Sequence, residues 1–505
     1  MRPPAGGDCN ARSGETRTVI ERFLNSSRRP ILLEPGEKQF LLDDDHYLLD
    51  VRNGGLIIQV WDESRNLVRR VTGVHSERPG KLELVIEKFG KRPGRLILAD
   101  LSRPAAATAE RHGKRLAFRE EFRRFLAREF PDWKATEVST EPNLEYSLSP
   151  AYPRALLKRG QSGMAAVSCP RDAGDATGAL SFGLIWLDYL RRRERRLTVE
   201  GLTLFLPQGL EHTTCLRLRW LDPTLARYLV FVYSPEGFTA RVDLADYGNL
   251  DTKLEPCSSS PAAADGGVAP LVERLRAIHK VECVECADGA SLRVRGLQFA
   301  RIDNGKLLFG IERMREAGAG SAGEIERLVR ELSRLRSAEA TDRENPLYRR
   351  QPERWLESRV RAHIEQVDAS LHPAPVYGQV PALAGGERGV IDLLATDIGG
   401  RLAVLELKAS EDIHLPLQAL DYWMRVRWHL ERDEFRTMGY FPGVTLSKRP
   451  PRLLLVAPSL DFHPTTEIIL RYFSPEVPVE RIGLAVEWRK TLRVAFRIEG
   501  AGCPI

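Results

Sequence analysis

The chain of 505 residues lacks the features that mark membrane proteins, secreted proteins and ATP-driven motors. It has no apolar run of the roughly 18 residues that a membrane-spanning helix requires. The stretch from Met1 to Gly14 has too few apolar side chains for a signal peptide. No Gly-x-x-x-x-Gly-Lys-Ser/Thr phosphate-binding loop occurs. We therefore expect no membrane-spanning segment and no use of ATP by this chain.

Cysteine is scarce, and the positive and negative charges nearly balance. The 7 cysteines are dispersed and odd in number, unlike the paired cysteines of a disulfide-stapled secreted domain. This predicts a reducing, cytoplasmic compartment. The formal net charge is +6, from 75 Lys and Arg against 69 Asp and Glu. Such a charge permits a nucleic-acid partner but does not establish one, so any phosphate-binding surface depends on local clusters.

Changes of pattern along the chain predict an α/β multidomain protein. Residues 1–104 alternate apolar and polar side chains in short runs, which predicts a small antiparallel β domain. Residues 253–344 open with a polar, small-residue linker at 257–267 and continue as an α+β connecting region. Within this region, apolar residues at helical spacing from Ile325 to Leu335 predict an amphipathic helix.

The most informative segment lies in the C-terminal third. Residues 390–395 and 402–408 are apolar enough to be buried strands, and the glycine-containing turn between them predicts a hairpin. These strands nevertheless carry Asp392, Glu406 and Lys408. An isolated buried charge is costly, so such residues need partners or a metal. Strand periodicity places Glu406 and Lys408 on one face, and we expect Asp392 beside them across the hairpin.

This pattern resembles the signature of the PD-(D/E)XK phosphodiesterase superfamily, which includes restriction and repair nucleases. Glu357, in a predicted helix from Glu353 to Val367, lies where many members place an acidic residue before the hairpin. Gln418-Ala-Leu-Asp-Tyr422 resembles the Q-x-x-x-Y element of RecB-type nuclease domains. The resemblance covers roughly residues 345–500 and implies a restriction-endonuclease-like α/β domain over residues 345–505.

The resemblance implies a metal-dependent nuclease that hydrolyses DNA, with RNA as a less favoured substrate. The cofactor would be Mg²⁺ or Mn²⁺, which favour oxygen ligands and activate a bound water. Whether the chain forms a homodimer stays open. The implied roles are catalysis by Lys408, Glu406, Asp392 and Glu357, metal binding by Asp392, Glu406 and the Leu407 carbonyl oxygen, and support by Gln418 and Tyr422.

Comparison of the sequence with itself indicates an internal duplication. The order helix, hairpin, helix, strand, helix, strand recurs in residues 105–252 and 345–505. The aligned segments are Arg154 to Pro170 with Asp392 to Lys408, Leu187 to Tyr189 with Leu420 to Tyr422, Leu204 to Pro207 with Leu455 to Pro458, and Arg219 to Pro223 with Arg471 to Pro475.

The alignment has a chemical consequence for the first copy. It matches Asp392 with Arg154, Glu406 with Ser168 and Lys408 with Pro170. No metal-binding carboxylate remains, so residues 105–252 are predicted to be a degenerate restriction-endonuclease-like domain. We expect this first copy either to pack against the catalytic copy as a pseudo-dimer or to bind a substrate.

Weaker signals stay open. The basic run Arg191, Arg192, Arg193, Arg195 and Arg196 could contact phosphates, although such runs are more often solvated helix ends.

Cys283 and Cys286, with His279 before them, have the spacing of half a zinc site, but no second pair completes it nearby. Two alternative functions also stay open. One is a non-catalytic nucleic-acid-binding or interaction scaffold built on duplicated nuclease-like folds. The other is an effector nuclease activated by a small ligand held in the middle region.

Overall fold

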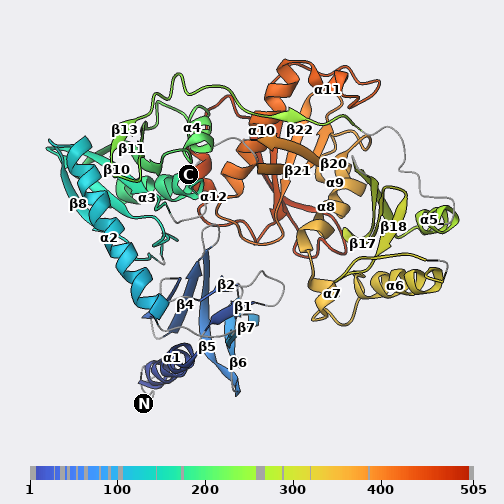
Figure 1. Ribbon diagram of the computed structural model, residues 1–505, viewed down its shortest axis with the longest axis horizontal. Coiled ribbons are helices and arrows are strands. Elements are labelled where there is room, and N and C mark those ends of the chain that lie inside the picture. The colour runs from blue at the N-terminus through green and yellow to red at the C-terminus, as the bar shows by residue number, and fades with distance from the viewer. Residues whose placement is uncertain are drawn as a thin grey trace, which may run out of the picture. The chain divides into compact units, whose positions relative to one another are not determined.

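The computed structural model shows a mixed α/β, multidomain protein with four β-sheets among the described residues (Figure 1). No helix in these residues has the length and apolarity to cross a membrane. Residues 258–267 of the predicted linker and the first six residues lie outside them. The described residues are 7–27, 29–34, 40–42, 46–52, 55–61, 66–78, 81–88, 92–100, 106–143, 145–171, 176–257, 268–286, 289–318, 320–384 and 387–499.

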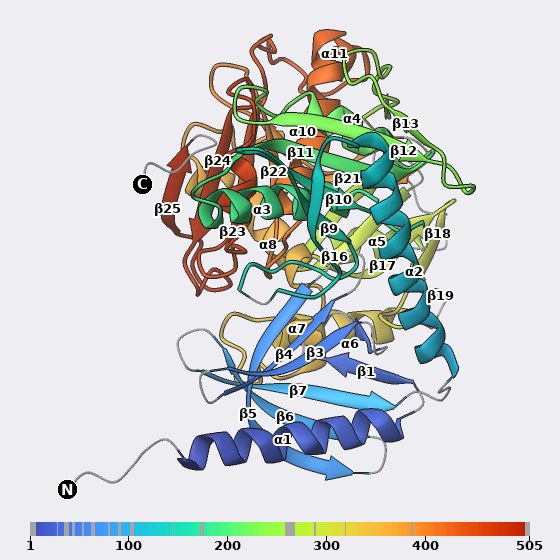
Figure 2. The same cartoon turned by 90° about the vertical axis from the view of Figure 1, so that its left-hand side faces the viewer.

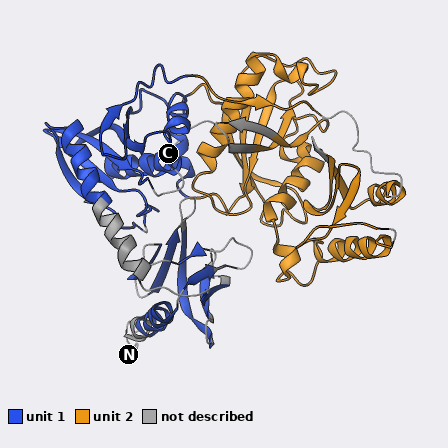
Figure 3. Ribbon diagram, in the orientation of Figure 1, with its two compact units in different colours: residues 1–248, 464–474 blue, residues 249–463, 475–505 orange. Residues whose placement is uncertain are grey.

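The chain divides into two compact units (Figure 3). Unit 1 contains residues 1–248 and 464–474, and unit 2 contains residues 249–463 and 475–505. Each unit holds two sheets. Residues 464–474 therefore belong to unit 1, although the sequence assigned them to the C-terminal domain.

The first sheet of unit 1 has seven antiparallel strands in the order β2-β1-β7-β6-β5-β4-β3. Helix α1 (Gly7–Ser26), absent from the sequence prediction, lies along this sheet (Figure 2) and buries Ile20, Phe23 and Leu24 in the core between them. The remaining residues of α1 are mostly polar, which obscured the helical pattern. The strands are β1 Pro30–Leu33, β2 Phe40–Leu41, β3 Tyr47–Arg52, β4 Gly55–Trp61, β5 Asn66–Arg78, β6 Lys81–Lys88 and β7 Arg92–Asp100.

The second sheet of unit 1 has six strands in the order β13-β12-β11-β10-β9-β8. Helix α2 packs Phe122, Phe125 and Leu126 into one hydrophobic cluster with this sheet, and α3 contacts β10 and β11. The elements are α2 Ala106–Glu129, β8 Lys134–Ser139, β9 Arg154–Arg159, β10 Ser162–Ser168, α3 Gly178–Arg193, β11 Thr198–Pro207, α4 His212–Leu218, β12 Arg227–Tyr233 and β13 Thr239–Arg241.

The first sheet of unit 2 has seven strands in the order β14-β20-β21-β22-β23-β24-β25. Helix α8 packs Trp355, Leu356 and Val360 against this sheet, and α10 contacts β22 and β23. The elements are β14 Lys253–Leu254, α8 Pro352–Ala362, α9 Ile364–Val367, β20 Tyr377–Ala384, β21 Glu387–Thr396, β22 Leu402–Leu407, α10 Leu415–Glu431, α11 Glu434–Thr437, β23 Arg452–Pro458, α12 Thr466–Leu470 (in unit 1), β24 Val479–Leu484 and β25 Val494–Glu499.

These two sheets share one topology. From β8 to β13 and from β20 to β25, the neighbour order and chain order correspond strand for strand. The third, fourth and fifth strands are parallel in each set, and the other pairs are antiparallel. The recurring order of elements in the sequence is therefore present in the fold.

Strand pairing corrects the gapless alignment by one residue on the second strand of the hairpin. Glu406 pairs with Leu455, whereas Val167 pairs with Leu204, the residue aligned with Leu455. Val167 in turn pairs with Arg154, the residue aligned with Asp392. The positions equivalent to Glu406 and Lys408 are thus Val167 and Cys169, not Ser168 and Pro170. The turn between β9 and β10 is shorter than the turn between β21 and β22, and a gapless alignment cannot accommodate that difference.

Side-chain packing agrees with this corrected register. Ala166 joins the hydrophobic cluster under α2, and Leu405 joins the cluster under α8. Both precede the position equivalent to Glu406, as alternation along a strand requires. The conclusion that the first copy lacks metal-binding carboxylates is unchanged.

The connecting region of unit 2 contains an antiparallel sheet with the strand order β15-β16-β17-β18-β19. The predicted amphipathic helix is confirmed as α6, which buries Ile325, Val329 and Leu332. The elements are α5 Ala269–Arg276, β15 Val281–Cys286, β16 Gly289–Val294, β17 Leu297–Asp303, β18 Lys306–Phe309, β19 Arg315–Glu316, α6 Ala322–Leu335 and α7 Pro346–Arg349.

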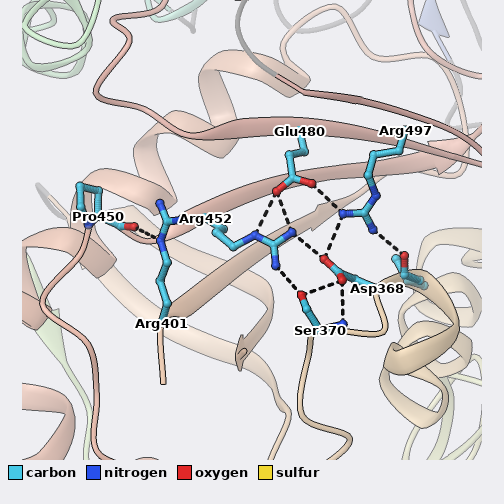
Figure 4. Close-up of polar contacts among 8 residues, drawn as sticks. Asp368, Ser370, Arg401, Pro450, Arg452, Glu480 and Arg497 are labelled. Atoms are coloured by element: carbon cyan, nitrogen blue, oxygen red, sulfur yellow. Dashed lines mark hydrogen bonds and ion pairs between the residues drawn. The ribbon is translucent and has the colours of Figure 1, made fainter. Parts of the chain in front are cut away.

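A charged network joins α9 to strands β23, β24 and β25 (Figure 4). Arg452 Nη2 lies 2.6 Å from Asp368 Oδ2 and 2.7 Å from Glu480 Oε1. Arg497 Nη1 lies 3.0 Å from the same Asp368 oxygen and 2.7 Å from Glu480 Oε2. The charges of these two cations and two anions balance, so the network leaves no net charge for a ligand.

Candidate functional site

The site is built on the β21–β22 hairpin. Leu393 pairs with Leu405, so the adjacent residues Asp392 and Glu406 stand opposite each other on the next rung. The backbone N–H of Leu407 donates a hydrogen bond of 3.0 Å to Asp392 Oδ2. This bond fixes the orientation of the Asp392 carboxylate across the hairpin.

Lys408 follows β22 directly and continues its pairing with β23. Its backbone N–H donates to the Val456 carbonyl at 3.0 Å. Its Nζ lies 3.5 Å from Glu406 Oε1 and 3.3 Å from Asp412 Oδ2. Asp412 is oriented in turn by the backbone N–H of His414 at 2.8 Å. The lysine is thus held between two carboxylates.

The predicted residues Asp392, Glu406, Lys408, Gln418 and Tyr422 surround a single cavity of about 260 Å³. Gln418 and Tyr422 lie one turn apart on α10, and Gln418 Nε2 donates to the Tyr422 hydroxyl at 3.3 Å. The complete lining is Glu353, Arg354, Val390, Asp392, Glu406, Lys408, Gln418 and Tyr422.

Burial strongly perturbs the pKa values of Asp392 and Glu406. Burial raises the pKa of Asp392 to about 6, against the opposing effect of the Leu407 N–H. Burial and the neighbouring Asp392 raise the pKa of Glu406 well above its ordinary value. Glu406 Oε2 is buried and has no hydrogen-bond partner among the described residues. Such an unsatisfied acidic oxygen beside a second carboxylate is suited to a cation.

Lys408, in contrast to these carboxylates, is stabilised in its charged form. Burial favours its neutral form, but the negative charges of Glu406 and Asp412 outweigh that effect and raise its pKa above the ordinary value. Lys408 therefore carries a full positive charge at neutral pH. Asp412 has a lowered pKa, because Lys408 and His414 overcome its burial.

Helix α8 places at the cavity an acidic residue, Glu353, that the sequence did not single out. Glu353 and Arg354 line the cavity, and Glu357 does not. Glu357 Oε2 accepts hydrogen bonds from Arg354 Nη1 and Gln379 Nε2, both at 2.8 Å. Burial raises the pKa of Glu357, and Arg354 partly opposes this. Its described bonds tie it to Arg354 and Gln379, and its charge still contributes to the raised pKa of Asp392.

Sequence reasoning could not separate these two glutamates. They lie one turn apart on the same face of a helix, so periodicity favours neither. The predicted helix from Glu353 to Val367 is also interrupted at His363, which separates α8 from α9. Asp412 was missed because it lies in the loop before α10, where an acidic residue carries no pattern.

The residues present fit a magnesium ion with few protein ligands. No group of three or more His, Cys, Asp or Glu residues is arranged for a metal in the described part of the chain. Magnesium commonly uses one or two carboxylates and takes its other ligands from water and substrate phosphates. Asp392 and Glu406, with its unsatisfied Oε2, meet this requirement.

Most of the basic run on α3 is engaged by the protein itself. Arg191 donates to the Val199 and Leu225 carbonyls at 3.0 and 2.8 Å, and Arg192 pairs with Asp188 at 2.7 Å. Arg193 pairs with Glu137 at 2.7 Å. Arg195 and Arg196 are exposed.

The possible zinc half-site is only partly visible. Cys283 is exposed on β15, and the side chain of Cys286 lies outside the described residues.

Comparisons with known proteins add little to this geometry. No family model matches the chain, and no curated protein matches it. Among solved structures, the apo form of EndoMS is similar over 38% of this chain and 84% of that chain, at 15% sequence identity and a TM-score of 0.12. A TM-score this low supports no argument about fold or function.

Proposed function

We propose that the protein is a metal-dependent phosphodiesterase that hydrolyses nucleic acid, with DNA as the favoured substrate. One observation carries the proposal. Asp392, Glu406 and Lys408 meet at one cavity, and an acidic oxygen of Glu406 is left without a partner there. Buried carboxylates with raised pKa values in a cleft are typical of functional sites, because a purely structural cluster would satisfy its polar atoms.

The residues take distinct roles in this proposal. Asp392 and Glu406 would hold Mg²⁺ or Mn²⁺, with the Leu407 carbonyl oxygen as a further ligand. The bound ion supplies Lewis-acid chemistry, which lowers the pKa of a water molecule and stabilises charge on the phosphate. Lys408, kept protonated by its two carboxylate neighbours, offsets the negative charge of the scissile phosphate and orients the attacking water.

Gln418 and Tyr422 would support the site from α10. Their mutual hydrogen bond leaves the Gln418 carbonyl oxygen able to accept a further bond from water. Contacts to the nucleic-acid backbone would supply most of the affinity, so binding should weaken steeply with salt. Arg192, Arg193, Arg195 and Arg196 are all exposed, but Arg192 and Arg193 form ion pairs with acidic residues, so Arg195 and Arg196 suit such contacts best.

A cleavage assay tests the proposal. Full-length protein is incubated with plasmid and with single-stranded DNA, in Mg²⁺ or Mn²⁺, and wild type is compared with Asp392→Ala. We expect cleavage by wild type only. Asp132→Ala is the matched control. It removes an exposed carboxylate that is distant from Asp392 in the sequence, and the variant should retain activity. Equal cleavage by wild type and Asp392→Ala would assign the activity to a contaminant.

The same assay addresses a non-catalytic scaffold, which one observation favours. Lys408 already forms ion pairs with Glu406 and Asp412, as in a structural cluster. If the scaffold interpretation holds, wild type and Asp392→Ala will both bind DNA in a mobility-shift assay, and neither will cleave it with any metal or substrate.

A further inference from the structure

Three arginine side chains converge on the ring of Trp355 inside unit 2. The Cζ atoms of Arg295, Arg336 and Arg489 lie 5.5, 4.8 and 5.3 Å from the centroid of this ring. They come from the turn between β16 and β17, from the residue after α6, and from the segment between β24 and β25. Trp355 is 0% exposed, so these three arginines, called the arginine cluster below, bring three positive charges to the edge of the core.

Arg336 is a buried charge without an acidic partner. Its side chain is 0% exposed. Its guanidinium donates to the backbone carbonyls of Leu347, Arg350 and Arg295 at 2.7, 2.6 and 2.9 Å, and its Nε is buried without a partner among the described residues. Neutral carbonyl groups satisfy N–H donors but do not cancel a charge, so the charge of Arg336 is left uncompensated.

Arg489 has the least satisfied donors of the cluster. Its guanidinium lies over the rings of Tyr348, Trp355 and Trp488 at 5.4, 5.3 and 4.4 Å from their centroids. It donates no hydrogen bond to a described residue, and its Nε is buried. Ring faces attract a cation but do not replace the oxygen acceptors that its five N–H donors require. This half-buried side chain is therefore held in place with its hydrogen-bonding capacity unused.

Electrostatics show the cost of the arrangement. Burial, together with the positive charge of Arg489, lowers the pKa of Arg336 to about 9. Burial also lowers the pKa values of Arg295 and Arg489. A lowered pKa in an arginine means that the fold disfavours its charge, which at neutral pH it still carries. The cluster is a local excess of positive charge that a bound anion would relieve.

Nearby carboxylates do not neutralise the cluster. Glu282, Glu339 and Asp461 oppose the lowering of the arginine pKa values through space. Glu282 is paired instead with Arg361 at 3.6 Å, and Glu339 accepts a hydrogen bond from Ser337. In the described part of the chain, no carboxylate lies within ion-pair distance of the cluster.

The turn that carries Arg295 is fixed against α8. Arg295 and Gly296 have φ values of +48° and +74°, as a two-residue type I′ turn requires, and such turns prefer Asn, Asp or Gly. A Cβ at Gly296 would lie 1.9 Å from the Arg354 carbonyl oxygen, so the turn lies directly against the helix backbone. Arg295 Nη1 also donates to the Arg336 carbonyl. An arginine is thus held in a strained backbone conformation at the cluster, which preorganises its guanidinium.

We propose that the arginine cluster binds a phosphate group. Phosphate oxygens accept the paired N–H donors of a guanidinium, and their negative charge offsets the excess of positive charge. Phosphodiesters of a nucleic-acid backbone and free phosphate offer the same oxygens. The cluster shares no residue with the lining of the catalytic cavity. Binding here needs no metal and no cleavage, so the site is a second, independent function of unit 2.

The first test measures thermal unfolding of the full-length protein in chelator. Inorganic phosphate at about 10 mM, compared with chloride at equal ionic strength, should raise the melting temperature of wild type by roughly 2–4 °C. Arg489→Gln should lose this rise. Arg327→Gln, which removes an exposed arginine of α6 outside the cluster, is the matched control and should respond as wild type does. General salt effects act on all three proteins alike.

The second test identifies the source of the phosphate. Binding of fluorescent duplex DNA is measured by anisotropy in chelator at several salt concentrations. With a nucleic-acid backbone in the site, Arg489→Gln weakens binding and reduces the slope of log Kd against log salt by about one, whereas Arg327→Gln does not. With free phosphate as the ligand, DNA binding of Arg489→Gln equals that of wild type, although its thermal response to phosphate is lost.

Arg295→Gln changes a different element of the cluster and should give the same losses. It decides the question if Arg489→Gln does not fold, as judged by circular dichroism. If wild type and the folded cluster variants show the same response to phosphate and the same salt slope with DNA, the inference is wrong. Neither measurement involves cleavage, so the proposed nuclease function and this inference fail independently.

Discussion

The ammonium group of Lys408 lies 3.3 Å from the carboxylate of Asp412, a residue outside the PD-(D/E)XK pattern. This pair is electrically neutral and stands beside Asp392 and Glu406. Once both of those carboxylates ionise, they add two negative charges that the Lys408–Asp412 pair does not neutralise, and such charges favour a divalent cation. Because Asp412 pairs with Lys408, the positive charge of the lysine is balanced by a carboxylate other than the two proposed to bind the metal.

The first prediction concerns this pair. Lys408→Ala should reduce the single-turnover cleavage rate by roughly 10²-fold to 10³-fold, because it removes a fixed charge from the developing phosphate charge. Asp412→Asn should have a smaller effect and should raise the metal concentration needed for half-maximal rate, because Lys408 then interacts with Glu406 alone. Lys306→Ala, at an exposed lysine, is the control. An unchanged rate for Lys408→Ala would contradict the assigned role.

The second prediction separates the two glutamates of α8. Glu353→Gln should weaken metal activation of cleavage, because Glu353 lines the cavity and adds negative potential there. Glu357→Gln should instead lower thermal stability, because Glu357 is buried and accepts hydrogen bonds from Arg354 and Gln379. Metal titrations and melting curves of both variants check this. The reverse pattern would restore the position that the sequence suggested for Glu357.

The third prediction is that Asp392→Asn stabilises the metal-free protein. The folded pKa of Asp392 is about 6, above the unfolded value of about 3.9. The free energy of unfolding therefore falls as pH rises from about 4 to about 6, where the carboxylate ionises only at a cost in the fold. Above pH 6 the variant should be more stable by about 3 kcal/mol, and below pH 4 the two proteins should converge.

Urea unfolding at several pH values measures this difference. Added Mg²⁺ should raise the melting temperature of wild type but not that of Asp392→Asn, because ligand binding stabilises only a fold that holds the ion. A variant less stable than wild type at pH 7.5 in chelator would show that Asp392 ionises without cost.

The fourth prediction concerns the charged network of Figure 4. Asp368→Asn should destabilise the protein by roughly 3 kcal/mol at neutral pH, because Arg452 and Arg497 then share one carboxylate in a buried position. Despite burial, the bonds from Ser370 and Arg452 lower the pKa of Asp368 to about 2. This stabilisation is present above the unfolded pKa of about 3.9 and is lost as pH falls through about 2.

The matched control is Asp303→Asn, which removes an ion pair with the half-exposed Arg301. It should change the free energy of unfolding by less than about 1 kcal/mol. Equal losses from both variants would mean that the Asp368 network contributes no more than a surface pair.

Several features of the fold followed from local patterns. The hairpin that carries Asp392 and Glu406 was predictable, because two apolar runs around a glycine turn favour paired strands. Helix α6 was predictable from apolar residues at helical spacing. Helix α1 was not, because only a few of its side chains reach the core. The topology that the two sheets share was visible as a repeated order of elements even where few residues are identical.

Other features needed the three-dimensional pairing of strands. A shift of one residue on β10 changes the equivalents of Glu406 and Lys408 from Ser168 and Pro170 to Val167 and Cys169. A one-residue shift of register moves every side chain of a strand to the opposite face of the sheet. Only the hydrogen bonds to the neighbouring strands determine that register. The pairing of Leu221 with Phe473 joins segments far apart in the chain, which no local pattern reports.

The sequence by itself determined which acidic and basic side chains sit in the apolar hairpin, because strand periodicity and the cost of buried charge act locally. Only the tertiary structure decided that Glu353 rather than Glu357 lines the cavity, that Asp412 neutralises Lys408, and that residues 464–474 join unit 1. These outcomes depend on the packing of helices and loops against a sheet, and packing is settled by shape and contact between segments that the chain order keeps apart.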